Sequence, residues 1–100
     1  MANFFGNLFG AASIASLKEK LTDGAVLLDV RTRSEFGGEH AEGSKNIPLD
    51  ELVHNLSELD ENMPVIVVCA SGVRSKKAAS ILKKSGFAEV FNGGSWTNFG

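Results

Sequence analysis

The sequence predicts an α/β fold with a central parallel sheet of about five strands and helices on both faces. Two unbroken apolar runs, at 25–28 and 65–68, lack the polar alternation of a half-exposed strand, which indicates strands covered on both sides. Segments with helical spacing alternate with the strand-like segments along the chain. This alternation is typical of parallel sheets joined by right-handed crossovers.

Periodicity and Gly or Pro breaks set the expected elements. Ile14, Leu17 and Leu21 recur at the spacing of one helix face, and Gly86 is placed to end a later helix that buries Ala78, Ala79 and Leu82. In chain order we expect a helix over 13–21, a strand over 25–28, a helical turn near 34–36 with Thr32 or Ser34 as its cap, a short extended segment at 46–48, a helix near 50–56, a strand over 65–68, a helix over about 75–84 and a strand over 89–91.

Size and composition fit one domain. The chain has 100 residues, of which 43% are hydrophobic and 22% charged, as in ordinary globular proteins. Its net charge of −2 argues against a nucleic-acid-binding protein. We expect a Phe-rich N-terminal arm at 1–12 and a domain at 13–100.

The arm lacks the features of a signal peptide or a membrane span. No Lys or Arg precedes Lys18, and Gly and Asn residues interrupt an apolar stretch that is shorter than the roughly 20 residues a span requires. Phe4, Phe5, Leu8 and Phe9 have the spacing of a membrane-touching stripe, but packing of the arm onto the domain is favoured. We therefore expect a cytoplasmic protein with no membrane span.

The chain contains one cysteine, Cys69, which follows the second apolar run directly. One thiol excludes an internal disulfide, a Cys-rich zinc site and a two-thiol redox couple within the chain. Ligands of parallel sheets bind beyond the carboxyl ends of the strands, and the helix that follows residues 69–74 would direct its positive end at the thiol. Arg74, Lys76 and Lys77 flank it and favour an anionic ligand. The alternative is a buried, inert cysteine.

The loop Cys69-Ala70-Ser71-Gly72-Val73-Arg74-Ser75 resembles the active-site loop of rhodanese-like sulfurtransferases. The same family resemblance extends to four further segments in the same order, namely 27–31 with Glu35-Phe36, 40–48, 65–68 and 91–96. It covers roughly residues 13–100 and implies a rhodanese-like fold. Phosphatases that resemble this fold have five residues between Cys and Arg, whereas Cys69 and Arg74 enclose four, which favours sulfur transfer over phosphatase or arsenate-reductase chemistry.

The resemblance implies a two-step relay with Cys69 as the catalytic nucleophile and no metal or organic cofactor. Substrate would bind to the loop residues Ala70, Ser71, Gly72, Val73, Arg74 and Ser75. The expected partners are a small-molecule sulfur donor such as thiosulfate, a thiol or cyanide acceptor and a sulfur-accepting protein. A non-catalytic interaction module and a redox sensor that uses Cys69 alone remain as alternatives.

One position departs from the family pattern. Many family members carry Arg directly after the nucleophile, where this chain has Ala70, and we expect weak thiosulfate binding as a result.

Structural roles are favoured for several other residues whose side chains could also act in a site. Asp29 and Arg31 could form a catalytic pair, but a scaffold role is favoured. His40 and His54 do not have metal-ligand spacing. Trp96 is expected to pack against the sheet.

Overall fold

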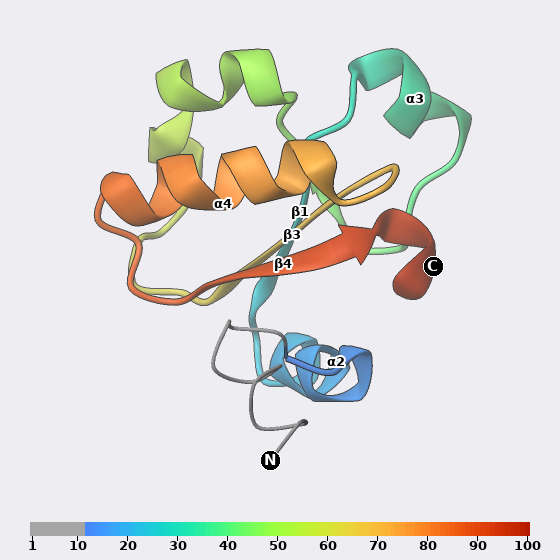
Figure 1. Cartoon of the computed structure of the whole chain (residues 1–100), viewed down its shortest axis with the longest axis horizontal. Helices are drawn as coiled ribbons and strands as arrows, with labels where there is room; N and C mark the ends of the chain where they lie inside the picture. The colour runs from blue at the N-terminus through green and yellow to red at the C-terminus, as the bar shows by residue number, and fades with distance from the viewer. Residues whose placement is uncertain (1–11) are drawn as a thin grey trace.

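The computed structural model describes residues 12–100 and shows a parallel sheet with helices on both faces (Figure 1). The sheet has four strands in the order β2-β1-β3-β4, close to the expected count. The strands are β1 (Val26–Asp29), β2 (Lys45–Asn46), β3 (Val65–Cys69) and β4 (Val90–Ser95), and their pairings are parallel. Residues 1–11, which include most of the predicted Phe-rich arm and its apolar stripe, lie outside the described residues.

The helices follow the expected order with shifted ends. They are α2 (Ile14–Thr22), α3 (Arg33–Gly38), α4 (Val73–Lys84) and the 3-10 helices η1 (Leu49–His54), η2 (Leu56–Glu58) and η3 (Trp96–Asn98). Within residues 12–100, none of the helices has the length and apolar character that a membrane crossing requires. Thr32 caps α3 in a capping box with Glu35, as one of the two expected caps.

Two segments differ from the sequence prediction. The helix expected near 50–56 is divided into two 3-10 helices, η1 and η2. Their turns are closed by hydrogen bonds between residues three positions apart, such as the bond from the Asn55 N–H to the Leu52 carbonyl. The last strand runs to Ser95 through Gly93, although glycine usually weakens strands. A Cβ at Gly93 would lie 2.8 Å from the Phe99 ring, so only glycine permits this close packing.

Side chains of β3 alternate between two core clusters on opposite faces of the sheet. Val65, Val67 and Cys69 belong to the cluster beneath α4, which also contains Ala78, Ala79 and Leu82. Ile66 and Val68 belong to the cluster beneath α2, against which Trp96 packs. This alternation directs the Cys69 side chain toward the α4 face of the sheet.

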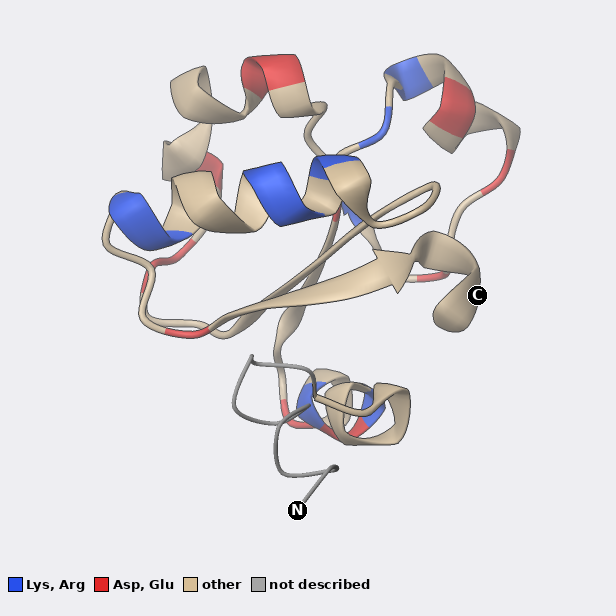
Figure 2. Cartoon of the chain, in the orientation of Figure 1, with Lys and Arg blue, Asp and Glu red and all other residues tan. Residues whose placement is uncertain are grey.

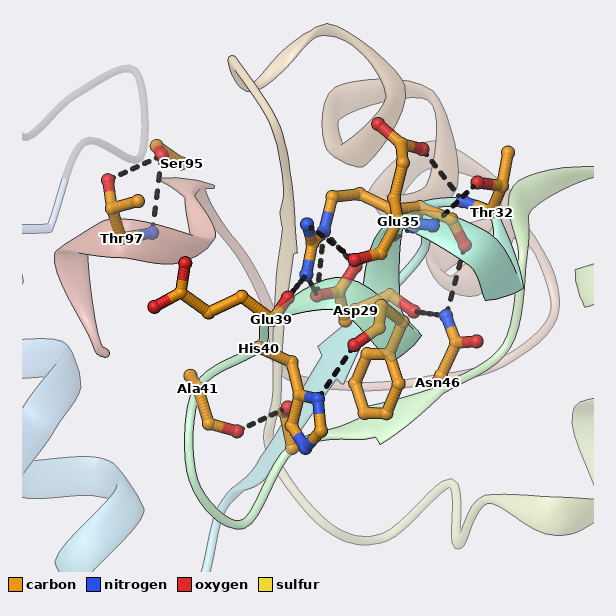
Figure 3. A network of polar contacts seen from close by, with 12 residues as sticks. Asp29, Thr32, Glu35, Glu39, His40, Ala41, Asn46, Ser95 and Thr97 are labelled. Atoms are coloured by element: carbon orange, nitrogen blue, oxygen red, sulfur yellow. Dashed lines mark hydrogen bonds and ion pairs between the residues drawn. The ribbon is translucent and has the colours of Figure 1, made fainter.

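A buried ion pair lies at the carboxyl end of β1. Asp29 is fully buried, and both its carboxylate oxygens accept bonds from the Arg31 guanidinium, at distances of 2.8 to 3.0 Å. Arg31 also donates to the carbonyls of Glu35 and Glu39, while Asn46 Nδ2 donates to the carbonyls of Asp29 and Arg31 (Figure 3). These contacts join β1, α3 and β2, which favours the scaffold role for the pair.

Candidate active site

Cys69 ends β3 directly beneath the start of α4. Its Sγ accepts hydrogen bonds from the backbone N–H groups of Gly72 (2.9 Å) and Ser75 (3.4 Å). Gly72 is the residue before α4 and has a φ of +103°, a backbone conformation that favours glycine. This tight turn starts α4 at Val73, two residues earlier than expected, and brings its first N–H groups to the sulfur.

The surroundings of Cys69 favour the thiolate. Burial raises the pKa of the thiol, since Cys69 is only 1% exposed. Hydrogen bonds from the backbone N–H groups of Ser75, Gly72 and Ser71 act in the opposite direction, and the pKa lies below the ordinary thiol value. The positive end of α4 acts in the same direction as these bonds. The thiolate is the form in which a cysteine can act as a nucleophile.

Neither of the two loop serines caps α4. The residue at the cap position is Gly72, which has no side chain to offer. Ser71 is exposed, whereas Ser75 is fully buried and its hydroxyl donates to Asn92 Oδ1 at 2.6 Å. Asn92 is not among the site residues predicted from the sequence. In the sequence Asn92 directly follows the strand expected over 89–91, and this position is the signal that points to it.

Arg74 is part of an ion pair rather than a free positive charge on the rim. Its Nη1 and Nη2 donate to the two carboxylate oxygens of Glu35, at 2.7 and 3.0 Å. The bond from Arg74 and the backbone bond from Thr32 lower the pKa of Glu35 to about 2. Glu35 in turn raises the pKa of Arg74. This ion pair could not be predicted from local sequence patterns, because the two residues are 39 positions apart.

The other predicted loop residues lie at the surface. Ala70 is exposed, and Val73 is 75% exposed. Lys76 and Lys77 are exposed on α4, whose charged residues are all basic (Figure 2). The expected positive rim therefore consists of these lysines on α4 together with an Arg74 whose charge is compensated.

A surface hollow of about 830 Å³ lies between α4 and η1, and is lined by Val30, Thr32, Pro48, Leu49, Asp50, Val53, Arg74, Lys77, Ser80, Ile81 and Lys84. It shares Arg74 with the loop but is not lined by Cys69. We place the candidate site at the loop because Cys69 and the groups that donate hydrogen bonds to its sulfur are there.

The two histidines have no metal-binding surroundings. His40 stacks on the Phe36 ring, with ring centres 3.8 Å apart, and its Nδ1 bonds the Phe36 carbonyl at 2.8 Å. Over residues 12–100, no group of three or more His, Cys, Asp or Glu side chains is arranged to hold a metal ion.

Known proteins share both the sequence and the fold. YqhL of Bacillus subtilis is 43% identical over 68 residues, which are 68% of this chain and 54% of that protein. The "Putative sulfur carrier protein YrkF" of Bacillus subtilis is 39% identical over 82 residues, 80% of this chain and 44% of that protein. Thiosulfate sulfurtransferase GlpE of Pseudoalteromonas translucida is 32% identical over 85 residues, 84% of this chain and 81% of that protein.

A solved structure and a family comparison agree with these relatives. The crystal structure of a rhodanese-like domain protein from Staphylococcus aureus matches with a TM-score of 0.74 and 32% identity, over 87% of each chain. The chain spans about half the length of YqhL and YrkF. The rhodanese-like domain family matches residues 13–99, nearly the whole chain, and the chain therefore belongs to that family.

Proposed function

We propose that this domain transfers a sulfane sulfur from a donor such as thiosulfate to a thiophilic acceptor, through a persulfide on Cys69. The observation that carries the proposal is the Cys69 sulfur held by the N–H groups of Gly72 and Ser75 at the start of α4. The thiosulfate sulfurtransferase activity in the name of GlpE and the sulfur carrier in the name of YrkF support it.

The reaction has two balanced steps. In the first, the Cys69 thiolate attacks the outer sulfur of thiosulfate, the S–S bond of the donor breaks, and sulfite leaves with the bonding electron pair. In the second, an acceptor such as cyanide attacks the outer sulfur of the persulfide, and thiocyanate leaves while the thiolate is restored. This is covalent catalysis of the ping-pong type. The loop N–H groups that stabilise the thiolate are placed to stabilise the persulfide anion by the same electrostatics.

The acceptor lies outside the chain, because the chain has no second cysteine to take the sulfur. In the cell this acceptor is a thiol or a sulfur-accepting protein, and in an assay it is cyanide. The steps need no metal or organic cofactor. We expect the reaction in the cytoplasm, where thiols are kept reduced.

The test is intact mass of the reduced protein after addition of thiosulfate and then cyanide. We expect a gain of one sulfur atom that cyanide reverses, with release of thiocyanate. Cys69→Ser should fold with an unchanged circular dichroism spectrum and gain no sulfur. Sulfur transfer by Cys69→Ser would contradict the proposal. An unchanged mass of the wild type with thiosulfate, persulfide and mercaptopyruvate donors alike would favour an interaction module instead.

A further inference from the structure

The side chain of Asn92 comes from β4 and contacts the active-site loop at two points. Its Oδ1 accepts hydrogen bonds from the Ser75 hydroxyl (2.6 Å) and the Gly94 N–H (2.9 Å). Its Nδ2 donates to the Gly72 carbonyl (3.1 Å). The three contacts agree on one orientation of the amide, with its oxygen toward two donors and its nitrogen toward an acceptor.

Both loop residues that Asn92 contacts also hold the sulfur. Gly72 donates its N–H to Cys69 Sγ, and Ser75 contacts Sγ through its N–H and through its hydroxyl oxygen, which lies 3.5 Å from the sulfur. Asn92 is therefore connected to the sulfur by two routes, each through one residue. It is itself exposed, so it can be replaced without leaving a hole in the core.

The direction of the Ser75 hydroxyl hydrogen determines whether Ser75 donates a hydrogen bond to the sulfur or accepts one from it. Asn92 Oδ1 can only accept, so the 2.6 Å contact places this hydrogen toward Asn92. Ser75 Oγ therefore accepts a hydrogen bond from the Cys69 S–H, across the 3.5 Å between the two atoms. Once Cys69 loses its proton, the Ser75 hydrogen can turn to the thiolate only by leaving Asn92.

We propose that Asn92 is a positioning residue for Cys69, which acts by holding the Ser75 hydroxyl hydrogen away from the sulfur. In this arrangement Ser75 accepts from the thiol, and the backbone N–H groups hold the thiolate. Removal of the Asn92 amide frees the Ser75 hydrogen for a charge-assisted bond to the thiolate. The inference deepens the proposed sulfur transfer and rests on it for its biological meaning. It is tested on the ionisation of Cys69 without any sulfur donor.

The experiment measures the pH dependence of Cys69 ionisation in the full chain, by the rate of alkylation with iodoacetamide and by the ultraviolet absorbance of the thiolate. Both signals report one group, because Cys69 is the chain's one thiol. Asn92→Ala is introduced into the wild type and into Ser75→Ala. The substitution also removes the bond to the Gly72 carbonyl, but this loss is common to both backgrounds and cancels when the two changes are compared. The charged pairs Arg74–Glu35 and Asp29–Arg31 remain in every variant.

Asn92→Ala changes the pH midpoint of Cys69 ionisation in each background. We expect this change to be about one pH unit further downward with Ser75 present than in the Ser75→Ala background. An equal change in both backgrounds, or a further upward change with Ser75 present, would overturn the proposal and leave Asn92 as a brace for the loop. Asn98→Ala is the matched control, since Asn98 Nδ2 also bonds the β4 end, at the Gly93 carbonyl, without contacting the loop. It should leave the midpoint unchanged. Failure of sulfur transfer alone would leave this result unaffected.

Discussion

The groups that hold the Cys69 sulfur belong mostly to the backbone, and side-chain charge near them is limited. The N–H groups of Gly72 and Ser75 contact the sulfur, and the Arg74 guanidinium beside the loop is paired with Glu35. An anionic donor therefore meets little uncompensated positive charge from the loop's own side chains. Ala70, the residue directly after Cys69, is exposed and can accept a longer side chain without displacing the core.

Ala70→Arg should lower the KM for thiosulfate several-fold, because an added exposed cation near a dianion contributes up to about 1 kcal/mol. The kcat should change little, since the charge attracts donor and transition state alike. Initial rates of thiocyanate formation at low and high salt measure both constants. Ala70→Gln, a long uncharged side chain, is the control and should keep the wild-type KM. Equal KM values for the Arg and Gln variants, or a lowered KM that does not weaken with salt, would contradict this expectation.

At the scale of the elements, the Arg74–Glu35 pair joins two helices beside the site, α3 and α4. The sequence placed both helices in order, and it placed Cys69 at the end of a buried strand, because periodicity and apolar runs are local signals. It did not reveal the pair or Asn92. Side-chain partners from distant segments depend on how the strands are ordered in the sheet, and local periodicity carries no information on that order.

Glu35→Gln removes the negative charge and keeps an oxygen that can accept from the Thr32 N–H in the capping box. The pKa of Glu35 is about 2 in the folded protein against an ordinary 4.5. Its stabilisation is therefore complete above about pH 4.5 and is lost as the pH falls toward 2. We expect the variant to lose less than about 1 kcal/mol at neutral pH, because the pair is about one-third exposed.

Urea unfolding from pH 7 down to pH 2 measures this difference. The free energy of unfolding of Glu35→Gln should approach that of the wild type as the pH falls below 4.5. Glu58→Gln is the control, because Glu58 pairs with Lys45 at the longer distance of 3.4 Å and both side chains are more exposed than those of the Arg74–Glu35 pair. A constant difference between wild type and Glu35→Gln over the whole range would show that the ionised carboxylate contributes nothing to the pair.

At the scale of the whole molecule, two cores on opposite faces share one thin sheet. The strands β1 and β3 contribute to both cores, through Leu27 and Leu28 and through Ile66 and Val67. The buried Asp29–Arg31 pair lies where β1 leaves this sheet, and it fixes the backbone that leads to α3. Arg31 also lies over the Trp96 ring, with its guanidinium carbon 4.6 Å from the ring centre. The pair thus connects the first strand to the last segment of the chain.

Asp29→Ala should destabilise the whole domain, because it leaves the Arg31 charge buried without its carboxylate. Loss of one partner of a buried pair costs roughly 3 kcal/mol or more. For a domain of this size that lowers Tm by on the order of 15 °C, which calorimetry measures directly. Replacing both partners, in Asp29→Ala with Arg31→Leu, should be less destabilising than Asp29→Ala alone, since no charge then remains buried.

Sulfur transfer by Asp29→Ala should be lost in step with folding as the temperature rises. Lost transfer in an Asp29→Ala protein of wild-type Tm would show instead that the carboxylate takes part in the chemistry.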